Sequence, residues 1–122
     1  MELIEKELSY KIRGAVFEVS RQLGAGFLEK VYERALMIEL RNKGLKCESQ
    51  FPVTVNYKGY VIGDYIVDVL VENKIILEIK AQENIRPEHK AQILNYLKAT
   101  EIKIGLLINF THPKAVIERF VR

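Results

Sequence analysis

The 122-residue sequence predicts an α/β (α+β) fold, in which a mixed central β-sheet is flanked by helices in the order ααβββαβ(β). Apolar side chains recur at helical spacing near the N-terminus and again over residues 87–100, where Pro87 suits the first turn of a helix. Shorter apolar runs, separated by turns that contain glycine or proline, fill the rest of the chain. A chain of this length builds one core, so we expect residues 1–122 to form a single domain.

Two helices are expected before the first strand. The first covers residues 2–23 and ends at Gly24-Ala25-Gly26, because glycine readily adopts the left-handed conformation of a C-terminal cap. Its predicted buried residues are Ile4, Leu8, Ile12, Ala15, Val19 and Leu23. The second helix covers residues 27–43 and ends at Gly44. Its predicted buried residues are Leu28, Val31, Ala35, Leu36 and Leu40.

Strands are expected over residues 45–57, 60–71, 75–80, 102–109 and 114–121. Lys58-Gly59 forms the first turn, Glu72-Asn73-Lys74 the tip of a hairpin, and His112-Pro113 the last turn. Pro52 indicates an edge strand or a bulge, because proline has no N–H to donate to a ladder. In the last strand the residues predicted to face inward are Ala115, Ile117 and Phe120.

Composition excludes several kinds of site. No apolar run is long enough to span a membrane and the N-terminus does not resemble a signal peptide, so we expect a cytoplasmic protein. Cys47 is the only cysteine, which excludes an internal disulfide and a four-cysteine iron–sulfur or zinc site within one chain. His89 and His112 lack the further ligands that zinc requires. The net charge of +3 is compatible with a polyanionic partner.

Three charged residues interrupt two apolar runs and are the strongest functional signal. Glu78 and Lys80 are two residues apart, so they share one face of a strand. If the hairpin tip centres on Asn73, Asp68 lies directly opposite Glu78, and like charges there are destabilising. A divalent cation relieves that repulsion, and a lysine beside it can hold a water molecule or stabilise charge on a phosphate. This arrangement is typical of a metal-dependent phosphodiesterase.

The alternative is a surface hairpin with its charges on the solvent face and one cross-strand ion pair. The neighbouring pattern weakens that alternative. Ile66 and Leu70 should share the face of Asp68, and Ile76 should share the face of Glu78. The charges are therefore predicted to lie on a largely apolar face.

Two helices carry further candidates. Glu29 and Tyr32 are three residues apart, so they share one face of the second helix, although a glutamate there can equally be a solvated partner of the helix dipole. His89, Gln92 and Tyr96 form one polar stripe on the third helix, and such groups can hydrogen-bond a phosphate, a base or the lysine. For His89, simple surface exposure explains the pattern equally well.

Taken together, these residues resemble the GxxExxY family, a branch of the PD-(D/E)XK nuclease superfamily. The matching positions are Gly26, Glu29 and Tyr32 of the family signature, Asp68 and Glu78-Ile79-Lys80 of the superfamily motif, and Gln92 and Tyr96 of the QxxxY motif of its exonuclease-type branch. The resemblance covers residues 5–120 and extends to Tyr57-Lys58-Gly59 and Gly105-Leu106-Leu107-Ile108-Asn109-Phe110. Their common order and spacing make the resemblance specific.

The resemblance implies a restriction-endonuclease-like core and a Mg²⁺- or Mn²⁺-dependent nuclease acting on nucleic acid, with DNA as the expected substrate. The implied roles are metal binding by Asp68 and Glu78 with the Ile79 carbonyl as a third ligand, assistance from Glu29, water activation or charge stabilisation by Lys80, and orientation of Lys80 or the phosphate by Gln92 and Tyr96. A homodimer that embraces a duplex is compatible with so small a domain. The alternative function is a nucleic-acid-binding or protein-interaction module that keeps the fold without turnover.

Overall fold

The computed structural model describes residues 5–122, so the predicted core residue Ile4 lies outside the described chain. The elements are α1 (Lys6–Leu23), α2 (Glu29–Asn42), β1 (Cys47–Tyr57), β2 (Tyr60–Val71), β3 (Ile75–Lys80), α3 (Pro87–Thr100), β4 (Ile104–Asn109) and β5 (Val116–Val121). The predicted order is confirmed, and the third helix has the predicted bounds.

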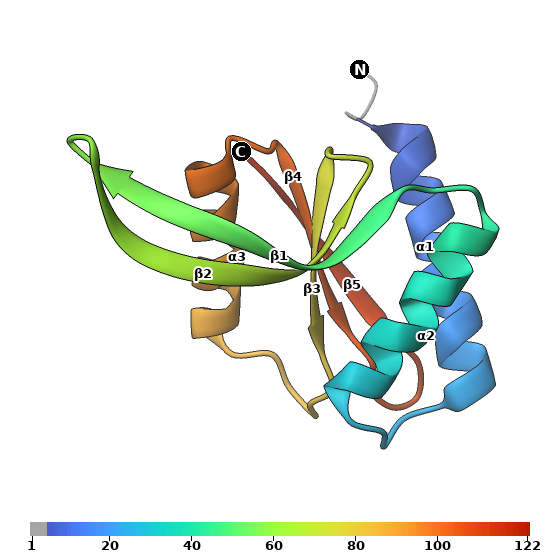
Figure 1. The fold of residues 1–122 in the computed structure, drawn as a ribbon. Helices are drawn as coiled ribbons and strands as arrows, with labels where there is room; N and C mark the ends of the chain where they lie inside the picture. Colours follow the sequence, from blue (N-terminus) through green and yellow to red (C-terminus); the bar gives the residue numbers. More distant parts are fainter. Residues whose placement is uncertain (1–4) are drawn as a thin grey trace.

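The five strands form one mixed sheet in the order β1-β2-β3-β4-β5 (Figure 1). All neighbouring strands are antiparallel except β3 and β4, which are parallel and are connected through α3. A parallel pair needs such a crossover, because a tight turn can join only antiparallel strands. The crossover brings α3 against β4 and the hairpin strand β1.

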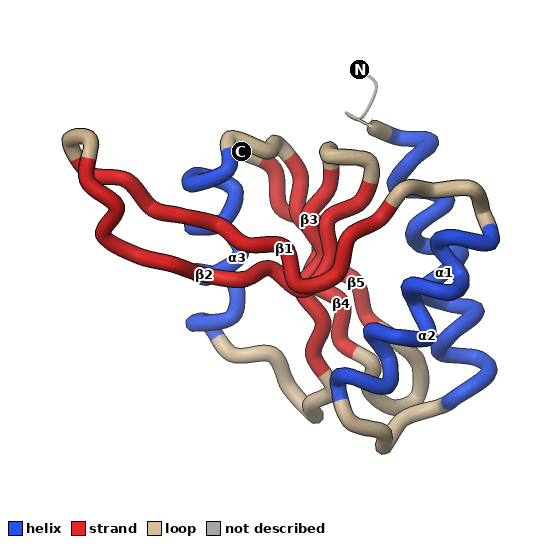
Figure 2. The backbone as a smooth tube through the Cα atoms, viewed as in Figure 1, coloured by secondary structure: helices blue, strands red, loops and turns tan. Residues whose placement is uncertain are grey.

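Helices cover both faces of the sheet (Figure 2). On one face, α1 and α2 pack on a large apolar cluster that includes Val69, Leu77 and Leu106. On the other face, α3 packs on a smaller cluster that includes Leu70 and Ile76. Residues of even number in β3 therefore face α3, which assigns Glu78 and Lys80 to that side.

The contact between α3 and the sheet is close. A Cβ atom added to Gly105 of β4 would lie 2.9 Å from the side chain of Ile93 in α3. A larger residue at this position would force the Ile93 side chain to shift, so the glycine allows α3 to pack closely on β4.

The buried side of α2 differs from the prediction. Leu28 is 78% exposed and precedes the helix, and Val31 is also exposed, whereas Tyr32 and Met37 are buried. The helix is rotated by about one residue, or 100°, from the predicted orientation, because the aromatic ring of Tyr32 takes the core position. Leu36 and Leu40 are buried as predicted.

The β1–β2 hairpin is longer than the other strands and projects beyond the rest of the sheet over α3 (Figure 1). Val69 packs on the side of α1 and α2, whereas Val67 packs on the side of α3, although residues two apart on a regular strand share a face. The hairpin therefore changes face at Asp68. Opposite this point in β1, Gln50 has a left-handed backbone (φ 54°) and its side-chain amide donates to buried Glu33 at 2.9 Å.

This change of face corrects one prediction. Ile66 was expected beside Leu70 on the face of Asp68, but Ile66 is 55% exposed and Leu70 is buried. Leu70 and Ile76 do line the apolar side of the carboxylates as expected.

No helix among residues 5–122 is long and apolar enough to cross a membrane. The cytoplasmic location stays a prediction.

Candidate active site

Asp68 and Glu78 meet at the end of the β2–β3 ladder. The paired residues Val69–Leu77 and Leu70–Ile76 set the register, and one further step places Asp68 opposite Glu78, as the turn centred on Asn73 predicts. Backbone pairing between the two strands stops there. The Ile79 N–H donates its hydrogen bond to Oδ2 of the Asp68 side chain, at 2.7 Å. The bond fixes the Asp68 carboxylate against β3, next to Glu78.

Glu78 is a buried carboxyl group with an incomplete set of partners. It is 4% exposed, and its Oε1 atom has no hydrogen-bond partner within the described chain. Burial, the charge of Asp68 and a hydrogen bond with Asp68 raise the pKa of Glu78 to about 9, and Lys80 opposes this shift only in part. A buried carboxyl oxygen without a partner is costly, so an external ligand that binds there gains stabilisation from a pre-formed acceptor.

The segment that carries Lys80 is held by β4, a feature that the sequence analysis missed. The Phe110 N–H donates to the Lys80 carbonyl at 2.8 Å. Buried Asn109 bonds both backbone groups of Gln82: its Oδ1 accepts the N–H at 3.0 Å, and its Nδ2 donates to the carbonyl at 2.9 Å. A buried asparagine at the end of an apolar strand was the available signal, because such a group needs hydrogen-bond partners.

We expect Asn109→Ala to lower the free energy of unfolding by about 1–3 kcal/mol, because it leaves both backbone groups of Gln82 without their partners. Chemical denaturation measures this loss. Asn109→Asp retains the acceptor for the Gln82 N–H and should fall between the parent and the alanine variant. If Asn109→Ala leaves the free energy of unfolding unchanged, the Asn109 hydrogen bonds do not hold this segment.

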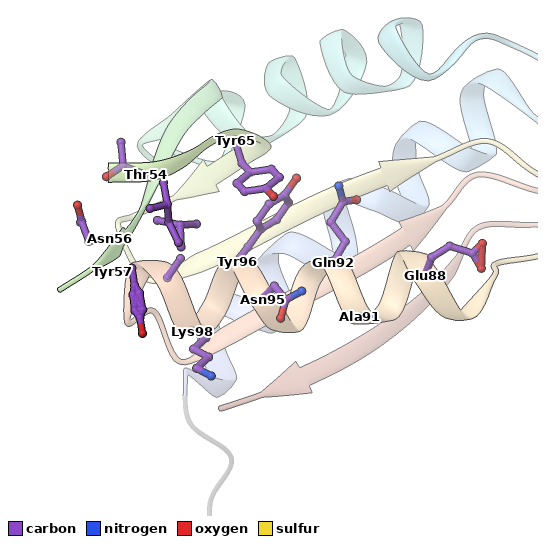
Figure 3. Close-up of a pocket in the computed structure, with 13 residues that line it drawn as sticks. Thr54, Asn56, Tyr57, Tyr65, Glu88, Ala91, Gln92, Asn95, Tyr96 and Lys98 are labelled. Carbon is purple, nitrogen blue, oxygen red and sulfur yellow. The ribbon is translucent and has the colours of Figure 1, made fainter. Parts of the chain in front are cut away.

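Gln92 and Tyr96 extend from α3 on the side of Tyr65 (Figure 3). Tyr96 is buried, and burial together with the charges of Glu78 and Asp68 raises the pKa of its phenol to about 12. The phenol therefore keeps its proton at neutral pH and can donate a hydrogen bond. The ring of Tyr65 from β2 lies beside it, with the ring centroids 5.9 Å apart.

His89 has a defined orientation at the start of α3. Its Nδ1 atom accepts the Arg86 N–H at 3.2 Å, so the neutral ring carries its proton on Nε2. Desolvation and the nearby charge of Lys80 lower the pKa of His89. The residue is thus a neutral donor at physiological pH rather than a plain exposed histidine.

The GxxExxY residues divide into a buried and an exposed part. The buried Tyr32 hydroxyl donates to the Gly24 carbonyl at 2.5 Å and accepts the Phe27 N–H at 3.2 Å, while its ring stacks on Phe110 with centroids 4.4 Å apart. Glu29 is exposed in the first turn of α2. Tyr32 therefore fixes the loop before Glu29 through two hydrogen bonds and packs this loop against Phe110. The Phe110 N–H in turn donates to the Lys80 carbonyl.

The described residues contain no group of three or more histidine, cysteine or acidic side chains placed to hold a metal ion. The structure brings together Asp68, Glu78, Lys80 and Tyr96, whereas Glu29 does not join the two carboxylates in such a group. The geometry thus offers two acidic side chains, one of them with an unpartnered buried oxygen.

Comparison with known protein families gives a match that covers nearly the whole chain. The model of the PD-(D/E)XK nuclease superfamily matches residues 6–120. The chain belongs to the PD-(D/E)XK nuclease superfamily. The mixed five-stranded sheet with helices on both faces agrees with the fold that the resemblance to this superfamily implied.

Two solved structures have a similar fold. SSO0001 has a TM-score of 0.59 at 21% sequence identity, with 97% of this chain and 59% of SSO0001 covered. An alkaline exonuclease from Laribacter hongkongensis has a TM-score of 0.55 at 12% identity, with 100% of this chain and 72% of the exonuclease covered. This chain therefore spans 59% of the length of SSO0001. A comparison with curated protein sequences gives no match.

Proposed function

We propose that the protein is a metal-dependent nuclease that hydrolyses phosphodiester bonds, with DNA as its substrate. One observation carries the proposal: the buried Glu78 carboxyl has an oxygen without a partner and lies beside Asp68 on the strand that also bears Lys80. A binding module without chemistry gains nothing from this unfavourable arrangement. The superfamily supports a nuclease, and membership of the GxxExxY branch is part of the proposal.

The donor set fits a hard divalent cation. Asp68 and Glu78 would hold Mg²⁺ or Mn²⁺ through carboxylate oxygens, the Ile79 carbonyl would add a third oxygen, and Glu29 would assist directly or through water. Glu78 must lose its proton to act as a ligand, so binding and deprotonation are linked. When bound, the cation would supply Lewis-acid stabilisation of charge on a phosphate and lower the pKa of a bound water molecule.

The other residues have roles that follow from their own chemistry. Lys80 is a compact ammonium donor on the same strand face as Glu78, so it would position the attacking water or stabilise charge on the phosphate. The Tyr96 phenol keeps its proton and, with the Gln92 amide, would orient Lys80 or the scissile phosphate. His89 would offer its Nε2–H to a neighbouring phosphate oxygen.

Cleavage of a supercoiled plasmid tests the proposal. The parent and the Asp68→Ala variant are purified in parallel and incubated with Mg²⁺, Mn²⁺ or EDTA. We expect nicked or linear product with the parent in metal only, and at least a hundredfold less product with Asp68→Ala. If the parent binds nucleic acid but never cleaves it with either metal, the alternative binding module is the correct function. The homodimer remains a prediction, which sedimentation of the parent measures.

A further inference from the structure

A groove of about 780 Å³ runs between α3 and the projecting half of the β1–β2 hairpin (Figure 3). On one side it follows a single stripe of α3 that extends from Glu88 to Ala99. The opposite side is the face of the hairpin, because Val55 of β1 and Ile62 of β2 both contribute to it. The groove is therefore formed by a helix and the projecting hairpin, whose outer strand β1 is an edge strand of the sheet.

The groove adjoins the candidate active site at Tyr96. Gln92 and Tyr96 line it, and Tyr96 is also the residue whose pKa responds to the charges of Glu78 and Asp68. Tyr65 lines the groove beside Tyr96. A ligand lying in the groove would thus contact Tyr96, the residue on which the charges of the two carboxylates act.

The lining combines aromatic rings, amides, one lysine and one glutamate, Glu88, which lies at the end of the α3 stripe opposite Lys98. Tyr65 and Tyr57 are half-exposed, so their faces are available to a ligand, and Asn95 adds a side-chain amide from α3. Lys98 lies at the end of the groove near Tyr57, as Figure 3 shows, and the Nζ atom of Lys58 is 5.4 Å from the Tyr57 ring centroid. Proteins that bind single-stranded nucleic acid stack its bases on aromatic rings and bind its phosphates with cationic side chains.

The aromatic lining favours one form of nucleic acid. The stripe from Glu88 to Ala99 is about 16 Å long at 1.5 Å per residue. Bases can stack on tyrosine rings only when they are unpaired, so this lining favours a single strand over a duplex.

We propose that this groove is the binding channel for one strand of nucleic acid, and that it feeds single-stranded or unpaired substrate past Tyr96 to Asp68 and Glu78. The proposal rests on the proposed nuclease function and specifies its substrate. Bases stack on Tyr65 and Tyr57, and the phosphates beyond the site lie near Lys98 and Lys58. An extended peptide is disfavoured, because its uncharged backbone offers no phosphates to Lys98 and Lys58.

The test is a binding titration of a 5′-labelled 12-nucleotide oligothymidylate by fluorescence anisotropy, in Ca²⁺, for the parent, Tyr57→Leu and Tyr65→Leu. Leucine keeps the apolar bulk but cannot stack on a base. The matched control is Tyr10→Leu, because Tyr10 is 78% exposed on α1, far from the groove lining. We expect each groove variant to bind about fivefold or more weakly than the parent, the control to bind equally, and a blunt duplex of the same length to compete poorly.

Tyrosine emission provides a second readout, because the chain contains no tryptophan. Stacking should quench the parent's emission on addition of the unlabelled oligonucleotide, and the quench should shrink in both groove variants. If the parent binds the single strand but neither variant is weakened, or if the duplex binds more tightly, the channel is wrong while the nuclease proposal stands. If the parent binds neither form, the channel is wrong, and the plasmid assay decides separately on the nuclease.

Discussion

The Lys80→Ala variant should cleave nucleic acid about 10²–10³-fold more slowly than the parent, because removal of a key electrostatic group typically costs about 3–4 kcal/mol of transition-state stabilisation. Lys80 is half-buried and lies on the strand face of Glu78, where its charge acts on the reacting groups. Binding of substrate in Ca²⁺ should weaken far less, because affinity comes from many contacts along the strand. Single-turnover cleavage beside a binding titration separates the two effects.

Three further variants sharpen this result. Lys80→Arg should not restore the rate, since the planar guanidinium cannot replace a compact ammonium. Tyr96→Phe should have an intermediate rate, because it keeps the ring packing but loses the protonated phenol. Lys74→Ala is the control, because Lys74 lies at the tip of the same hairpin and pairs with Glu5 at 3.8 Å in an exposed position. Parental activity in Lys80→Ala would show that Lys80 is a surface residue or that the cleavage comes from a contaminant.

The double variant Asp68→Asn/Glu78→Gln should remove a pH dependence of stability that the parent shows without metal. The pKa of Glu78 is raised to about 9 in the folded chain, from 4.5 in the unfolded chain. Between these values the folded protein binds one more proton than the unfolded protein, so the stability of the parent falls as pH rises. The loss between pH 4.5 and pH 7 is about 3 kcal/mol for this group.

Urea denaturation at pH 5, 7 and 9 in EDTA measures this effect. The free energy of unfolding of the double variant should depend much less on pH. Relative to the parent, the double variant should therefore become more stable as pH rises. With Mn²⁺ present, the parent should recover stability at high pH through linkage, and the double variant should not. Equal Mn²⁺ stabilisation of the two proteins would mean that Asp68 and Glu78 are not the ligands.

The sequence was sufficient to predict the part of the site that depends on local geometry. A two-residue spacing placed Glu78 and Lys80 on one face, and the turn centred on Asn73 placed Asp68 opposite them. Both follow from the regular alternation of a strand. Pro87 and the helical spacing after it likewise gave the bounds of α3.

What could not be predicted depends on tertiary contacts. The hairpin changes face at Asp68 because its far half packs on α3, so strand alternation wrongly placed Ile66 beside Leu70. Asn109 bonds Gln82 across 27 positions: the apolar strand before Asn109 indicates that its amide needs partners, but not that Gln82 supplies them. The groove requires α3 and the hairpin to face each other, which only the folded chain shows.

Calorimetric titration of the metal-free parent with Mn²⁺, repeated at pH 7 in buffers of different ionisation enthalpy, tests the central claim most directly. If Asp68 and Glu78 form the metal site, binding must displace the proton that Glu78 holds at this pH, so about one proton should be released per ion bound. Both the binding heat and the proton release should disappear in Asp68→Asn/Glu78→Gln. Binding without proton release, or equal binding by the double variant, would contradict the assignment of these two carboxylates.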